Sequence, residues 1–192
     1  EKFYLLGKAQ RKHRKYKRAI DSLRKARVTC LPDSDLWVRS SLLSAQVHTI
    51  KRDLAGVKRI VRQMKKHQPE HSFVDDALIQ LSRAYERNNQ ASKAQAVFKK
   101  ILKEHQDGDQ VNFAAWRLAY SHIRQGAYQK AIPWLKKLKG RHAPQGAYWR
   151  ARALEKTHPK EARRQYQSVV LDFPLSFYSW LALARLEKID PA

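Results

Sequence analysis

His67, Glu70 and His71 are the residues whose types and spacing come closest to a catalytic motif, because they spell H-x-x-E-H. One class of zinc peptidases uses this spacing, with both histidines on one face of an unbroken helix and a glutamate as base. Pro69 lies inside the motif, and proline interrupts a helix interior. We therefore interpret the segment as a polar loop between helices and predict no metal and no cofactor.

The rest of the sequence offers no arrangement that predicts catalysis. A nucleophile with a neighbouring base, a glycine loop for phosphates and a close pair of carboxylates are all lacking. Cys30 is the single cysteine, which excludes an intramolecular disulfide and a cysteine-based zinc site. The prediction is a chain without enzymatic activity of its own.

Charge is the strongest chemical feature of the sequence, since 40 lysines and arginines against 17 acidic residues give a formal net charge of +23. The densest basic run, over 11–18, is either a solvated turn and helix face or a contact for phosphates and other anions, and both stay open. Without a recognition motif, nucleic acid ranks last among the anionic partners that this charge allows. Charges also interrupt every apolar run before the roughly 18 residues that a membrane span needs.

A repeat of roughly 37 residues organises the chain and must position any binding residues. Each copy has a short residue, at position 19, 57, 94, 131 or 162, followed four positions later by a large one. The tetratricopeptide pattern places such a pair on the second of two antiparallel helices, where the short residue lets the helices approach and the large one fills the gap. Prolines at positions 32, 69, 144 and 174 are expected to close repeats.

The repeat predicts an all-α fold, an α-solenoid of tetratricopeptide-like helical hairpins. We expect a single domain over 1–192 with about five repeats, over 1–33, 34–70, 71–108, 109–144 and 145–173, and a final helix over 174–189. No strand pattern competes, and six glycines are too few for the turns of a many-stranded β fold.

In such solenoids the first helix of each hairpin lines a concave groove that serves as the binding surface. In standard register the groove-facing side chains include Arg39, Gln46, Arg83, Arg87, Phe113, Trp116, Tyr120 and Arg124. Because rings stack on sugar faces and guanidinium groups bind carboxylates, the candidate ligand-binding residues are Arg39, Arg83, Arg87, Trp116, Tyr120 and Arg124. The alternative is that Trp116 and Tyr120 only pack between neighbouring first helices.

A more specific run of residues lies near the C-terminus, over 147–155, 161–166 and 173–186. Its pattern, YWRARAL, then EA with Tyr166, then FPLSFYSWLALARL, resembles the last helical repeats of the soluble lytic murein transglycosylases. The segment 175–186 is apolar almost all the way round a helix. We expect either that the chain continues beyond Ala192 or that this helix docks onto another domain.

The resemblance implies a periplasmic peptidoglycan lytic transglycosylase as the parent enzyme, with its signal peptide and C-terminal catalytic domain outside this chain. In that family the catalytic glutamate is followed by serine, and no glutamate of this sequence precedes a serine. The chain would then be a non-catalytic scaffold that helps to hold anionic murein and supports the catalytic domain. The alternative is an adaptor that binds an acidic or extended peptide of a partner protein. Nonspecific nucleic-acid binding is the third possibility.

Overall fold

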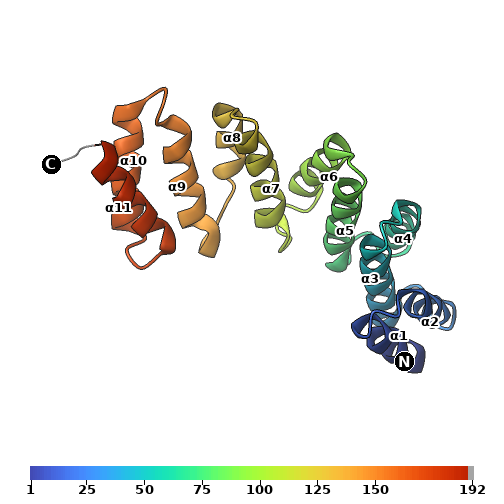
Figure 1. Ribbon diagram of the computed structural model, residues 1–192. Coiled ribbons are helices and arrows are strands. Elements are labelled where there is room, and N and C mark those ends of the chain that lie inside the picture. Colours follow the sequence, from blue (N-terminus) through green and yellow to red (C-terminus); the bar gives the residue numbers. More distant parts are fainter. Residues whose placement is uncertain (190–192) are drawn as a thin grey trace. The chain divides into compact units, whose positions relative to one another are not determined.

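The computed structural model describes residues 1–189, and within them every regular element is a helix (Figure 1). The expected all-α fold is confirmed for this part of the chain. Contacts divide the chain into two compact units, Glu1–Gln110 and Val111–Ala192, each of which is described by itself. Among residues 1–189, no helix combines the length and apolar character that crossing a membrane requires.

The first unit consists of three helical hairpins. They pair α1 (Lys2–Lys12) with α2 (Tyr16–Val28), α3 (Asp35–Ile50) with α4 (Leu54–His67), and α5 (Phe73–Arg87) with α6 (Ala91–Glu104). Each helix packs on the next along the chain, and α3 also contacts α1 and α5. The first helices of the three hairpins therefore lie side by side on one face of this unit (Figure 1).

The second unit begins with α7 (Val111–Arg124) and a short α8 (Tyr128–Leu135), followed by a 3-10 turn, η1 (Gly140–His142). Its remaining helices are α9 (Ala143–Leu154), α10 (Pro159–Asp172) and α11 (Phe177–Ile189), and α9 contacts α8, α10 and α11. Pro144, expected to close a repeat, instead lies in the first turn of α9. Proline is tolerated there because that N–H has no partner inside the helix.

The short and large residues of the repeat form the core. The short residues are at most 1% exposed: Ala19, Val57, Ala94, Ala131 and Ala162. The residues four positions later are at most 4% exposed: Leu23, Val61, Phe98, Leu135 and Tyr166. The spacing thus works as the pattern requires, because positions i and i+4 of a helix share one face.

The turn inside each hairpin repeats as well, which the sequence pattern did not reveal. One residue with a left-handed backbone occurs in each of the first four hairpins: Arg14 (φ 57°), Arg52 (φ 58°), Asn89 (φ 57°) and Gly126 (φ 70°). Each lies five positions before the short core residue of its second helix. The fifth hairpin, which turns around Thr157, has no residue of this kind among those described.

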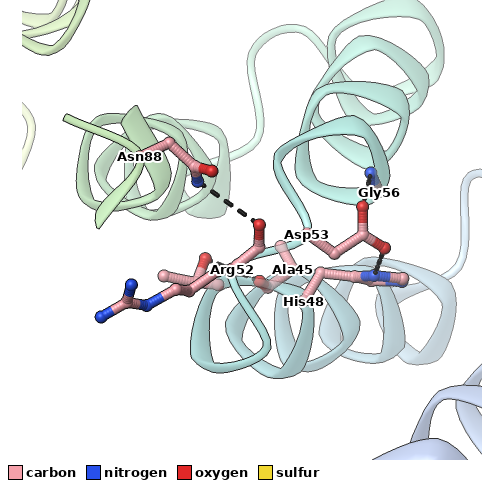
Figure 2. Close-up of polar contacts among 7 residues, drawn as sticks. Ala45, His48, Arg52, Asp53, Gly56 and Asn88 are labelled. Atoms are coloured by element: carbon pink, nitrogen blue, oxygen red, sulfur yellow. Dashed lines mark hydrogen bonds and ion pairs between the residues drawn. The ribbon is translucent and has the colours of Figure 1, made fainter. Parts of the chain in front are cut away.

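Figure 2 shows the turn between α3 and α4, where Asp53 caps the second helix. The Gly56 backbone N–H donates to Asp53 Oδ1 over 2.9 Å, and His48 Nδ1 lies 2.7 Å from Asp53 Oδ2. Asn88 Nδ2 donates to the Arg52 carbonyl over 3.4 Å and so ties this turn to the end of α5. A Cβ at Gly56 would lie only 2.2 Å from His48 Nδ1, so this turn requires glycine there.

Candidate functional site

The six candidate binding residues all lie on first helices. Arg39 is on α3, Arg83 and Arg87 are on α5, and Trp116, Tyr120 and Arg124 are on α7. The four arginines are exposed. Because α5 and α7 belong to different units, the two sets form two separate candidate surfaces.

In the first unit, Arg39 lines a hollow of about 310 Å³ over α1, α3 and α5. Its other lining residues are Tyr4, Leu42, Leu43, Gln46 and Phe73. Arg39 Nε pairs with Asp35 Oδ2 over 2.8 Å, but both side chains are more than half exposed, so water screens this pair. The hollow therefore combines a cation and an amide with an apolar floor.

Two features of this hollow were missed in the sequence. Tyr4 comes from α1 and Phe73 from the start of α5, and both were outside the predicted set. Gln46 Oε1 also accepts a hydrogen bond from an Arg11 guanidinium N–H, which brings one residue of the basic run 11–18 to the rim. Lys12 ends α1, and the rest of that run forms the turn at His13–Lys15 and the start of α2, where its lysines and Arg14 are exposed.

Arg83 and Arg87 are not lining residues of the hollow. Arg83 instead lies near enough to the carboxyl of Asp76 to oppose the rise in its pKa described below. Arg87 is the last residue of α5 and is exposed. Their role in binding therefore stays a prediction for the exposed side of α5.

In the second unit the rings form a row. The rings of Trp116 and Tyr120 stack with centroids 5.5 Å apart, and Trp116 also contacts the Trp149 ring on α9 at 5.9 Å. Trp116 thus packs between two first helices, whereas Tyr120 is 37% exposed at the outer end of the row. Phe113 is half-buried at the start of α7 and Arg124 is exposed at its end.

No close pair of carboxylates was predicted from the sequence, and for the folded chain that prediction was wrong. Carboxylate oxygens of Asp75, Asp76 and Asp109 lie within 4.8 Å of one another, close enough to hold a metal ion. Burial, and then the charges of the other two aspartates, raise the pKa of Asp76 to about 6. Gln110 Nε2 donates to Asp76 Oδ1 over 3.0 Å. Asp109 is distant in sequence, so only the fold brings it to the N-terminal turn of α5.

The H-x-x-E-H motif does not lie on one helix face. His67 is the last residue of α4 and contacts the Trp37 ring edge-on at 5.7 Å between centroids. His71 lies in the following turn, where its Nδ1 accepts from the Phe73 N–H over 3.1 Å. Both histidines therefore have structural contacts in different elements.

Some of the residues that carry the resemblance to lytic transglycosylases form the core of the second unit, whereas Leu175, Phe177 and Trp180 are exposed. Tyr148, Tyr166 and Tyr178 contact one another through Tyr148, with centroids 5.8 and 5.7 Å apart. The Tyr166 hydroxyl donates to Glu155 Oε1 over 2.5 Å, and Arg152 pairs with Oε2 of the same carboxylate. These side chains are needed for packing whatever the unit binds.

The comparison with protein families supports tetratricopeptide-like repeats in the middle of the chain. The model of the tetratricopeptide repeat family matches residues 79–147, which include α7, α8 and parts of the neighbouring hairpins. The chain is a tetratricopeptide-like helical repeat domain. No curated protein matches it.

Solved structures agree on the fold. The tetratricopeptide-like repeats of a Podosopora anserina protein assigned as a kinesin light chain match with a TM-score of 0.59 and 16% identity, over 88% of this chain and 92% of that one. The apo quorum sensor NprR from B. thuringiensis matches with 0.61 and 16%, over 97% of this chain and 58% of that one. The MamA protein matches with 0.55 and 15%, over 91% and 95%. At this identity the likeness shows the fold alone.

Proposed function

We propose that this chain is a non-catalytic scaffold that binds an extended, acidic segment of a partner protein on the first helices of its hairpins. The observation that carries the proposal is the hollow over α1, α3 and α5, in which Arg39 and Gln46 stand beside an apolar floor. A guanidinium binds a carboxylate, and an apolar floor accepts an aliphatic or aromatic side chain of the same peptide. Both features together suit a peptide better than a simple anion.

The charge of the chain supports an acidic partner. At +23 it attracts anions over distances comparable with the Debye length, about 8 Å at physiological ionic strength. Association should therefore slow as salt is added, while the apolar contacts in the hollow keep part of the affinity.

The test is peptide selection followed by titration. An array of extended peptides is screened on the whole chain, and the selected peptide is titrated by fluorescence anisotropy. Arg39→Ala should weaken binding about fivefold or more, the effect of losing one charge-assisted hydrogen bond. Arg62→Ala, an exposed arginine on the second helix α4, is the matched control and should leave binding unchanged. An array without a selective binder, or equal losses for both variants, would contradict the proposal.

A parallel titration addresses the second unit. Arg124→Ala on α7 is compared with Arg164→Ala, an exposed arginine on the second helix α10. Arg83→Ala gives the same comparison for α5. If the first helices bind the peptide, Arg83→Ala and Arg124→Ala weaken binding and Arg164→Ala does not.

The second candidate is a murein-holding scaffold of a periplasmic lytic transglycosylase, as the resemblance of the C-terminal run implies. The observation that favours it is Tyr120, an exposed ring beside Trp116 of the kind that stacks on sugars. The matching family and structures do not point to that enzyme class, so it ranks below the peptide scaffold. Co-sedimentation with purified sacculi, with duplex DNA as competitor, separates the candidates. Retention despite DNA supports murein binding, and loss to DNA indicates charge alone.

A further inference from the structure

The second unit contains a cavity that arises because α8 is short. Helices α4, α6 and α10 each have 14 residues, whereas α8 has 8 and contains Pro133. Proline removes a helical N–H, and the chain leaves the helix after Leu135. A cavity of about 500 Å³ lies between α8, α9 and α10. Its size is within the range of small-molecule sites.

Glycine keeps the end of α8 and the start of α9 in close contact. A Cβ at Gly146 would lie 2.6 Å from the Leu135 carbonyl oxygen. The two helices are therefore in contact at this point. Because α8 ends early, the space past this contact is not filled by a helix. The floor of the space is apolar: Ile132, Leu135, Leu138, Leu154 and Phe173.

Two residues that line this cavity each have a buried polar atom without a hydrogen-bond partner among residues 1–189. These atoms are Arg150 Nε, a donor, and Gln165 Oε1, an acceptor. Gln165 Nε2 donates to Glu161 Oε1 over 3.2 Å, which leaves Oε1 as the free end of the amide. A buried polar group without a partner costs about 1–3 kcal/mol, so such groups are rare and require an explanation.

The charges that line the cavity are of both signs. Lys136 and Arg150 supply cations, and Glu161 and Asp172 supply carboxylates. A simple anion would be repelled by the two carboxylates, and a simple cation by Lys136 and Arg150. A molecule with one charge of each sign can face both pairs at once.

We propose that this cavity binds a small zwitterion with an apolar side chain, that is, a free apolar amino acid or a short apolar peptide. Its carboxylate would accept from Arg150 Nε, its ammonium would donate to Gln165 Oε1, and its side chain would cover the apolar floor. The site is independent of the proposed function, since no lining residue is among those assigned to the partner peptide.

The experiment is isothermal titration calorimetry of the whole chain with four probes: leucine, Leu-Leu, N-acetyl-Leu-Leu and Leu-Leu amide. The zwitterions should bind saturably at one site, and each blocked form should bind about tenfold more weakly, because one charged hydrogen bond is lost. Comparing leucine with Leu-Leu distinguishes a free amino acid from a short peptide. The probe that binds more tightly identifies the class of ligand.

Three variants localise the binding. Gln165→Leu keeps the volume and removes the acceptor, and should weaken the zwitterion about tenfold. Gln167→Leu, an exposed glutamine on the same helix, is the matched control and should have no effect. Ser168→Trp at the exposed rim should block entry without changing the core.

The proposal is overturned if neither zwitterion binds, if the blocked forms bind as tightly, or if Gln165→Leu and Gln167→Leu behave alike. Partner-peptide binding is measured with the same variants. Since the cavity residues lie outside the first-unit hollow, Gln165→Leu should leave peptide affinity intact. Loss of both activities would indicate a folding defect, which the far-UV circular dichroism of each variant reveals, and Ser168→Trp then decides the question.

Discussion

The two units bury the same repeat positions with different chemistry. In the first unit the large residues after the short ones are hydrocarbon side chains, Leu23, Val61 and Phe98. In the second unit Leu135 fills this position in the first hairpin, but Tyr166 fills it in the next, and its buried hydroxyl requires the carboxylate of Glu155. Burial, followed by this hydrogen bond, raises the pKa of Tyr166. The repeat thus requires a large residue at this core position. Whether that residue can be polar depends on a neighbouring side chain that bonds its polar group.

The largest expected effect tests this difference at Tyr166. Tyr166→Ala should destabilise the second unit by about 3–5 kcal/mol, because it leaves a large cavity. Tyr166→Phe keeps the ring and should cost about 1 kcal/mol, the net worth of one hydrogen bond. Urea unfolding, with hydrogen exchange to locate the weakened unit, measures both. Equal costs for the two variants would mean that the polar contact, and not packing, holds the second unit.

The next effect is steric and lies in the first unit. Gly56→Ala should cost about 1–3 kcal/mol, as overpacking does, since its Cβ would collide with buried His48. The matched substitution in the second unit is Gly126→Ala. No atom lies within 4 Å of the added Cβ there, so the only cost is the strain of an alanine at positive φ. Thermal unfolding of both variants separates the two causes. A harmless Gly56→Ala would show that the turn of α3 and α4 is looser than the contacts around Asp53 indicate.

The hairpin turns offer a way to exchange residues between repeats. Asn89 and Gly126 occupy equivalent left-handed positions in α5–α6 and α7–α8. Gly126→Asn should therefore be nearly neutral, whereas Gly126→Val should cost about 1–2 kcal/mol, because a β-branched residue is strained at positive φ. Denaturant midpoints of the two variants measure the difference, and similar midpoints would contradict the equivalence.

Asp53→Ala should remove the cap of α4 and cost about 1 kcal/mol. The backbone hydrogen bond from Gly56 holds the pKa of Asp53 below its usual value, so this stability exists above pH about 4 and is lost as pH falls further. Burial lowers the pKa of His48, so protonation of His48 destabilises the folded state as pH falls below about 6.5. Curves of the free energy of unfolding against pH should show both losses of stability for the unsubstituted chain. The curve for Asp53→Ala should lack the loss below pH about 4.

The smallest effect is a gain. The pKa of Asp76, raised to about 6, means that the folded state binds a proton that the unfolded state releases, so stability falls as pH rises from 3.8 to about 6. Asp76→Asn should stabilise the first unit by up to about 1 kcal/mol at pH 7, after allowance for partial solvation. Asp21→Asn, exposed on α2, is the control and should change nothing. A gain at pH 4 as large as at pH 7 would exclude the electrostatic cause.

Much of the fold follows from the sequence, because positions i and i+4 share a helix face whatever the partner helix is. The short core residues, from Ala19 to Ala162, were placed correctly on that ground. The early end of α8 was missed, although Pro133 inside the expected helix was a visible signal. Register predicted that Arg39 and Gln46 share a face, but not that Tyr4 and Phe73 complete their hollow.

Contacts between distant segments depend on how helices cross, and the residue pattern does not encode this directly. Asp109 joins Asp75 and Asp76 only once α6 has returned the chain to the start of α5. Arg150 lies on α9 and Gln165 on α10, so the sequence pattern does not predict that both line one cavity.

The central claim is that the first helices bind an acidic partner segment, and hydrogen–deuterium exchange with a selected acidic peptide tests it most directly. In the first unit we expect slower exchange in α1, α3 and α5 and unchanged exchange in α2, α4 and α6. Protection confined to α2, α4 and α6, where most exposed lysines of this unit lie, would contradict the claim and leave a basic scaffold with unspecific attraction for anions.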